Sequence, residues 1–178
     1  MAPHVIVYPT FRCGLSCPYC LDAHTKISVA KPGQAYKAIK NIKIGDKLRT
    51  WDGENIVETT VVNTMSRKVY SILEITTEAG SKVFATKEHP FNVKGNWVEA
   101  GKLKVGDEII RPFNLLKAHD RIASIKKIKC QRRVYNLTCE PYPHYIAEGL
   151  WTHNCNWKTD GMSMTYTGGT KYTVEKEC

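Results

Sequence analysis

Three consecutive residues near the C-terminal end, His153, Asn154 and Cys155, have side chains that can break and remake a peptide bond. An asparagine amide can attack its own backbone carbonyl, and the succinimide that forms cleaves the chain after the asparagine. This reaction is slow without help, and a neighbouring histidine is an acid–base group near neutral pH. The following cysteine supplies a nucleophile. The motif therefore predicts cleavage after Asn154, with Cys155 able to accept an acyl group.

Cys20 can perform the complementary reaction at the other end. Its thiol can attack the carbonyl carbon of Tyr19 and convert the amide into a thioester. That step needs a histidine to protonate the departing nitrogen and a hydroxyl group to polarise or twist the bond. Thr86 and His89, in the stretch ATKEHPF, are the candidates for these two tasks.

The elements that must position these residues read as β-strands. Residues 26–150 contain short runs rich in Val, Ile, Thr and Tyr, separated by Gly, Asp, Asn and Pro. We also expect a strand over 5–10, a turn of helix within 33–42 and a long loop over 115–124. The tail after Cys155 is polar and glycine-rich, and we do not expect it to fold alone.

An internal repeat runs through the strand-like region. The segment IKIGDKL (42–48) returns as LKVGDEI (103–109), and RKVYSILEITTEAG (67–80) returns in weaker form over 132–149. Two matched pieces in the same order indicate a duplicated unit. We therefore predict an all-β fold of two related halves that share one core with pseudo-twofold symmetry.

Taken together, these motifs make the stretch from Cys20 to Cys155 closely resemble an intein, a self-splicing insert with the horseshoe-like Hint (hedgehog/intein) fold. The resemblance implies a class 1 mini-intein over 20–154, with flanking host fragments (exteins) over 1–19 and 155–178 and no homing endonuclease. The splice junctions would be Tyr19–Cys20 and Asn154–Cys155. The resemblance assigns catalytic roles to Cys20, Thr86, His89, Asn136, His144, His153, Asn154 and Cys155.

The chain departs from the intein pattern at two places in VYNLTCEPYPHYIAEG. Asn136 stands where inteins often have Asp, and an amide can hydrogen-bond but cannot carry a proton. Pro143 stands where a histidine is usual, and His144 follows one position later. His144 either substitutes through a local shift or faces solvent.

Removal of 20–154 would restore a CxxxCxxC motif made of Cys13, Cys17 and Cys155. This loop resembles the radical SAM family, in which three thiolates hold a [4Fe–4S] cluster and S-adenosylmethionine takes the open iron position. The resemblance implies both cofactors for the full-length spliced host and none for splicing. In the precursor, Cys20 already completes the motif together with Cys13 and Cys17. A metal bound by these three thiols would stall the first step of splicing. The alternative is that the motif is only a tolerated insertion point.

The amino-acid composition limits the kinds of function that the chain can have. The net charge is +9 and the hydrophobic content 42%, which suit a soluble domain with a core. We expect a cytoplasmic monomer that acts on its own flanks, without a nucleic acid or membrane partner. Two other functions remain: a metal-binding or Fe–S protein with a structural insertion, and a Hint domain that only cleaves. The Asn154–Cys155 pair favours splicing, since a plain metal protein does not need it.

Overall fold

The computed structural model describes residues 19–113 and 116–153, and these residues form strands with two short 3₁₀ turns and no α-helix. This confirms the predicted all-β class. In chain order the elements are β1 (Leu21–Asp22), β2 (Lys26–Lys31), β3 (Gln34–Ala38), η1 (Ile39–Asn41), β4 (Lys47–Trp51), β5 (Ile56–Thr77), β6 (Lys82–Ala85), β7 (Pro90–Val93), β8 (Asn96–Glu99), η2 (Ala100–Lys102), β9 (Glu108–Phe113), β10 (Leu116–Glu140), β11 (His144–Ala147) and β12 (Leu150–His153).

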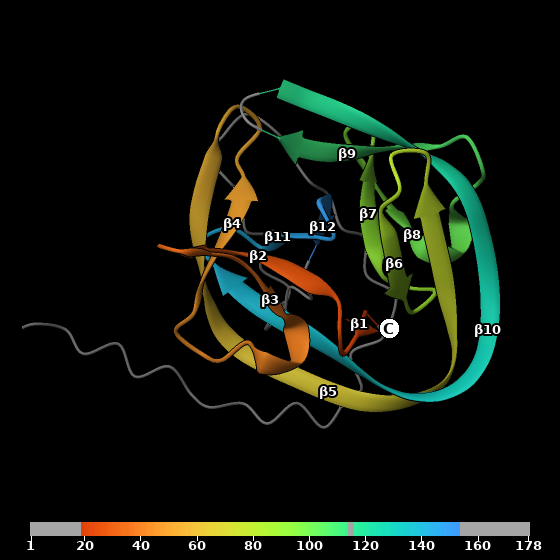
Figure 1. Cartoon of the computed structure of the whole chain (residues 1–178), viewed down its shortest axis with the longest axis horizontal. Coiled ribbons are helices and arrows are strands. Elements are labelled where there is room, and N and C mark those ends of the chain that lie inside the picture. The colour runs from red at the N-terminus through yellow and green to blue at the C-terminus, as the bar shows by residue number, and fades with distance from the viewer. Residues whose placement is uncertain (1–18, 114–115, 154–178) are drawn as a thin grey trace, which may run out of the picture.

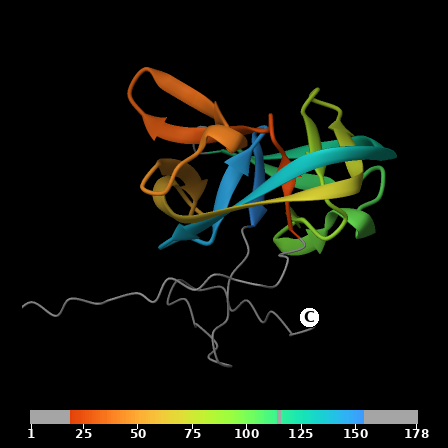
Figure 2. The same cartoon turned by 90° about the horizontal axis from the view of Figure 1, so that it is seen from below.

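Two long strands, β5 and β10, form the frame of the molecule. They pair antiparallel from Ile122 opposite Thr77 to Glu140 opposite Thr60. The register shifts at several bulges along this ribbon, and each bulge bends and twists the strands. Figure 1 shows the paired strands curving around the outside of the domain, and Figure 2 shows them crossing it side by side. The curvature produces the expected horseshoe shape.

The internal repeat of the sequence also appears in the structure, as matching backbone angles and hydrogen bonds. Segments 42–48 and 103–109 each follow a 3₁₀ turn, and each contains a glycine with positive φ, +92° at Gly45 and +93° at Gly106. In both segments an aspartate side chain accepts a hydrogen bond from the backbone N–H of the residue three places earlier. Lys43 donates to Asp46 and Lys104 donates to Asp107, each at 2.8 Å. Equal contacts at equal places support the predicted duplication.

The predicted loop over 115–124 is wrong, because β10 already begins at Leu116 and pairs with β9 from its first residue. Asp120 is buried, and its carboxylate accepts hydrogen bonds from Arg111 at 3.5 Å and from the backbone N–H of Ala79 at 3.1 Å. A buried charge with such partners is tolerated inside a sheet.

The helical turn predicted within 33–42 is only partly correct. The first half is strand β3, and only η1 turns helically. The strand predicted over 5–10 and the tail after Cys155 lie outside the described residues. Over 19–113 and 116–153, no helix is long and apolar enough to cross a membrane.

The first and last strands of the described chain both enter the middle of the molecule. β1 pairs with β6 and β10, whereas β12 pairs with β7 and β11. Figure 1 shows both strands inside the frame made by β5 and β10. Leu21 of β1 and Leu150 of β12 belong to the same hydrophobic cluster and are fully buried. Burial of these apolar side chains therefore holds the two ends of the domain in a common core.

Candidate active site

The backbone of Cys20 is bound on both sides by Thr86. The N–H of Cys20 donates to the Thr86 hydroxyl oxygen at 3.0 Å, and the N–H of Thr86 donates to the Cys20 carbonyl oxygen at 2.9 Å. The Thr86 hydroxyl also donates to that carbonyl at 3.3 Å. Cys20 is fully buried and Thr86 is 3% exposed. A hydroxyl group therefore contacts the nitrogen of the Tyr19–Cys20 bond, which is the bond predicted to break.

Asn136 lies beside the same cysteine. Leu21 is opposite Tyr135 in the antiparallel pairing of β1 with β10, so the register continued by one residue brings Cys20 opposite Asn136. Asn136 is 3% exposed, and its side-chain oxygen accepts the backbone N–H of Leu137 at 2.9 Å. This contact orients the amide, and an amide at this place can hydrogen-bond but cannot transfer a proton.

His89 closes a turn that starts at Thr86, because its backbone N–H donates to the Thr86 carbonyl at 3.0 Å. The side chain is fully buried. Burial is the main cause that lowers the pKa of His89 from 6.5 to about 3, and the charge of nearby His153 is the second cause. The ring is therefore neutral at pH 7. Its Nε2 is hydrogen-bonded to the hydroxyl of Thr152 on β12. The Thr86–His89 turn thus contacts both Cys20 and the strand that leads to Asn154.

His144 and His153 face each other across the β11–β12 hairpin. They are cross-strand partners, and their ring centroids are 6.4 Å apart. His144 is 9% exposed, so it does not face solvent. Its Nδ1 is hydrogen-bonded to the Thr50 hydroxyl at 2.7 Å. Burial is the main cause that lowers the pKa of His144 to about 3, and the charge of His153 is the second cause. The negative charge of Asp52 acts in the opposite direction.

Aromatic rings surround this histidine pair. The Trp97 ring stacks on His144 with centroids 6.1 Å apart and meets His153 edge-on at 4.9 Å. The Trp151 ring meets His144 edge-on, also at 4.9 Å. Such contacts exclude water and restrict ring rotation, which explains the lowered pKa of His144.

The sequence pattern missed three residues of this site: Thr50, Thr152 and Trp97. Thr50 and Thr152 are fully buried, although both read as ordinary strand residues in the sequence. The one available signal was that each threonine has a tryptophan neighbour in the chain, in TWD and WTH. Their importance arises only from contacts with residues far away in the chain.

Some of the predicted residues lie outside the described part of the chain, namely Cys13, Cys17, Asn154 and Cys155. Within the described residues no group of His, Cys, Asp and Glu is arranged to hold a metal ion. Cys20 and Cys139 are buried and Cys130 is half-buried, and no disulfide joins them.

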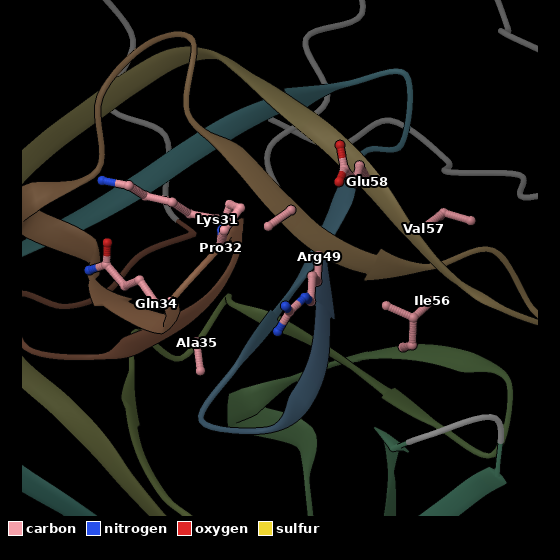
Figure 3. A pocket seen from close by; sticks show the side chains of 10 residues that line it. Lys31, Pro32, Gln34, Ala35, Arg49, Ile56, Val57 and Glu58 are labelled. Atoms are coloured by element: carbon pink, nitrogen blue, oxygen red, sulfur yellow. The ribbon is translucent and has the colours of Figure 1, made fainter.

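A surface hollow lies between the β2–β3 hairpin and strands β4 and β5 (Figure 3). Its lining includes Lys31, Arg49 and Glu58 and none of the residues described above. This hollow is therefore separate from the described residues of the candidate site.

Comparison with known proteins identifies the class. Residues 29–155 match the family described as Pretoxin HINT domain. The solution structure of the bacterial intein-like domain from Clostridium thermocellum is 30% identical, covers 76% of this chain and 98% of its own, and superposes with a TM-score of 0.68. The crystal structure of a DnaB intein from Synechocystis sp. PCC 6803 has a TM-score of 0.71 at 19% identity, over 78% of this chain and 99% of its own. The chain belongs to the HINT domain family.

A curated relative, an uncharacterized protein of Methanocaldococcus jannaschii, is 29% identical over 110 residues. These residues are 57% of this chain and 15% of the relative, so the chain spans a small part of that protein. Membership of the HINT family and the likeness to an intein-like domain at 30% identity support protein splicing or autoprocessing as the activity of the chain.

Proposed function

We propose that residues 20–154 excise themselves and join Tyr19 to Cys155. The observation that carries this proposal is the hydrogen bond from the Cys20 N–H to the Thr86 hydroxyl, at 3.0 Å. The nitrogen in this contact is the leaving group of the first reaction. A buried hydroxyl at a leaving nitrogen has an evident chemical use, whereas the antiparallel pairing of strands needs only the backbone of Thr86.

The first step forms a thioester at Cys20. The Cys20 sulfur bonds to the carbonyl carbon of Tyr19, the carbon–nitrogen bond breaks, and the nitrogen leaves as an amine. Thr86 holds that nitrogen and orients it. His89 is neutral at pH 7, so it can take the thiol proton and return it to the leaving nitrogen.

The later steps use the C-terminal junction. The Cys155 thiol takes the acyl group from Cys20, and the Asn154 amide then cyclises and releases residues 20–154. The thioester that remains between Tyr19 and Cys155 rearranges to an amide. His153 precedes Asn154 in the chain, and His144 lies opposite His153, so we assign both histidines to the assistance of cyclisation. Asn136 orients groups near Cys20 without transferring a proton.

The proposal includes a mini-intein without an endonuclease. In support, only two residues separate the end of β9 at Phe113 from the start of β10 at Leu116. Splicing in this form uses no cofactor, since every group comes from the chain. The protein acts as a monomer on its own flanking segments, in the cytoplasm, and nucleic acid and membranes have no part in the reaction.

The host part of the proposal rests on the sequence. Joining Tyr19 to Cys155 restores the CxxxCxxC spacing of Cys13, Cys17 and Cys155. In a radical SAM host these thiolates would hold a [4Fe–4S] cluster that binds S-adenosylmethionine. Cys20 could join Cys13 and Cys17 at a metal in the precursor, and splicing would then be slower with zinc than with a chelator.

Intact-mass measurement of the freshly expressed full chain, followed over time with a reducing agent, tests the proposal. Splicing predicts one species of residues 20–154 and another in which 1–19 is joined to 155–178. Separate peptides 1–19 and 155–178 would show that the domain only cleaves. Cys20→Ala is the control for the first step and Asn154→Ala for the release, and a parent chain that stays whole would contradict the proposal.

A further inference from the structure

Thr152 connects the two halves of the site. It lies on β12, two residues before Asn154, and is fully buried. Its hydroxyl oxygen has two partners, the carbonyl oxygen of Pro90 at 2.8 Å and Nε2 of His89. Its backbone pairs with Phe91 of β7. One side chain near the C-terminal junction therefore contacts the histidine assigned to the N-terminal junction.

The positions of the hydrogens follow from these contacts. A hydroxyl group has one hydrogen, and the Pro90 carbonyl can only accept, so the hydroxyl of Thr152 must donate there. The Thr152 oxygen then accepts from His89, which places a hydrogen on Nε2. Because a neutral imidazole carries one ring hydrogen, Nδ1 of His89 carries none. This Nδ1 is buried and has no hydrogen-bond partner among the described residues.

We propose that Thr152 is a positioning residue that holds His89 in the Nε2–H tautomer and leaves the Nδ1 lone pair as the base for the Cys20 step. The proposal rests on the splicing function proposed above. Nδ1 takes the proton of the Cys20 thiol, the sulfur bonds to the Tyr19 carbonyl carbon, and Nδ1–H returns the proton to the leaving nitrogen of Cys20. The histidine ends as it began. In the opposite tautomer, Nδ1 already carries a hydrogen and cannot accept the thiol proton.

A structural role alone does not explain a threonine here. Valine has nearly the same shape and an equal preference for strands, and it would leave no hydroxyl to satisfy in a buried place. The hydroxyl adds only the bonds to Pro90 and His89. Since Thr152 sits on the strand that leads to Asn154, the proposal also makes the first reaction depend on the docking of β12. The N-terminal bond would be activated only while the C-terminal junction is in place.

Nuclear magnetic resonance of the ring nitrogens tests the tautomer directly. The full chain with Cys20→Ala and Asn154→Ala is chemically inert, so its His89 can be observed with ¹⁵N-labelled histidine. We expect a hydrogen-bearing Nε2 and a bare Nδ1. Thr152→Val should give a mixture of tautomers, and Thr152→Ser should restore the parent pattern. A hydrogen on Nδ1 in the parent, or an unchanged pattern in Thr152→Val, would overturn the proposal.

The chemical consequence is measured as thiol-induced cleavage at Tyr19–Cys20 in the Asn154→Ala chain. Thr152→Val should slow this cleavage by roughly 10- to 100-fold, and Thr152→Ser should restore most of the rate. Thr64→Val, an equal change at an exposed position of β5, is the matched control and should not alter the rate. Equal rates for Thr152→Val and the parent would also overturn the proposal.

The two measurements separate this proposal from the splicing function. A parent chain that forms no thioester, yet shows a bare Nδ1 on His89, would refute splicing and support the assignment of the tautomer. If Thr152→Val does not fold, the parent and Thr152→Ser spectra still decide the question, because a hydrogen on Nδ1 in either would contradict the proposal.

Discussion

Thr86 hydrogen-bonds to both ends of the Cys20 backbone, through its side chain at the N–H and through its own backbone at the carbonyl. The backbone contact belongs to the strand pairing that continues from Leu21 opposite Ala85. The side-chain contact adds a hydroxyl at the scissile nitrogen. A substitution of Thr86 that preserves its shape therefore separates the catalytic contact from the structural one.

We predict that Thr86→Val slows thiol-induced cleavage at Tyr19–Cys20 by about 100-fold or more in the Asn154→Ala chain. The physical reason is the loss of the hydroxyl that holds the leaving nitrogen. Thr86→Ser keeps the hydroxyl and should retain most of the rate. The measurement is the rate of appearance of peptide 1–19 by mass spectrometry. Equal rates for the Val and Ser variants would show that the hydroxyl has no chemical role.

Asn136→Asp should add a further titration to the pH dependence of N-terminal cleavage. The carboxylate can still accept the N–H of Leu137, but it adds a titrating group opposite Cys20 in the sheet. Because the position is 3% exposed, the uncharged form is favoured there, and we expect a stability loss of about 1–3 kcal/mol at pH 7. The check is the pH–rate profile of N-terminal cleavage, beside urea unfolding. Superimposable profiles for the two chains would argue against proximity of residue 136 to the reaction.

Thr50→Val should act on the C-terminal junction alone. It removes the hydrogen bond that fixes the His144 ring, so we expect cyclisation of Asn154 to slow by roughly 10-fold. Release of peptide 155–178 from the Cys20→Ala chain measures this step. Thr50→Ser should behave like the parent, and N-terminal cleavage should not change. A parallel loss of both reactions would instead indicate general unfolding.

Stability should fall with acid in a range where carboxylates do not yet titrate. His89 and His144 both have a pKa of about 3 in the folded chain and an ordinary value of 6.5. Below pH 6.5 the unfolded chain binds protons that the folded chain does not, so protonation favours unfolding. The free energy of unfolding should therefore be constant above pH 6.5 and decrease below it, by at most about 1.4 kcal/mol per pH unit for each histidine.

Urea denaturation of the inert Cys20→Ala, Asn154→Ala chain between about pH 5 and pH 8 checks this slope. A His144→Gln variant should have a flatter pH dependence, since one of the two buried imidazoles is gone. A parent chain whose free energy of unfolding does not change over this range would mean that neither histidine is held neutral by burial.

The duplicated turns should respond alike to mutation. Gly45 and Gly106 have φ angles of +92° and +93°, and a Cβ at either place would meet no atom within 4 Å. Replacement by alanine therefore costs only backbone strain, and we expect a loss of about 1–2 kcal/mol at each turn. Thermal unfolding of the two single variants measures this. Clearly different losses would indicate that the two turns are not structurally equivalent.

Two kinds of information were readable from the sequence. The β-branched runs and the repeated Gly-Asp turns predicted an all-β fold with duplicated units, because strand preference and turn chemistry depend on neighbours in the chain. The candidate ends, Cys20 and Asn154, were also readable, since each side chain would attack a bond next to itself. The loop predicted over 115–124 is wrong because the strand there pairs with β9 and buries Asp120 among partners from other parts of the fold, which the local sequence does not show.

By itself, the sequence determined the chemical groups, their order along the chain and the class of fold. The tertiary structure decided which groups meet. It buried His144 opposite His153, although inteins usually have a histidine one position earlier, where this chain has Pro143. It also brought Thr50 into contact with His144 and Thr152 into contact with His89. The reason is that strand register and ribbon curvature set contacts between residues far apart in sequence, and a register shift by one residue would turn each side chain to the opposite face.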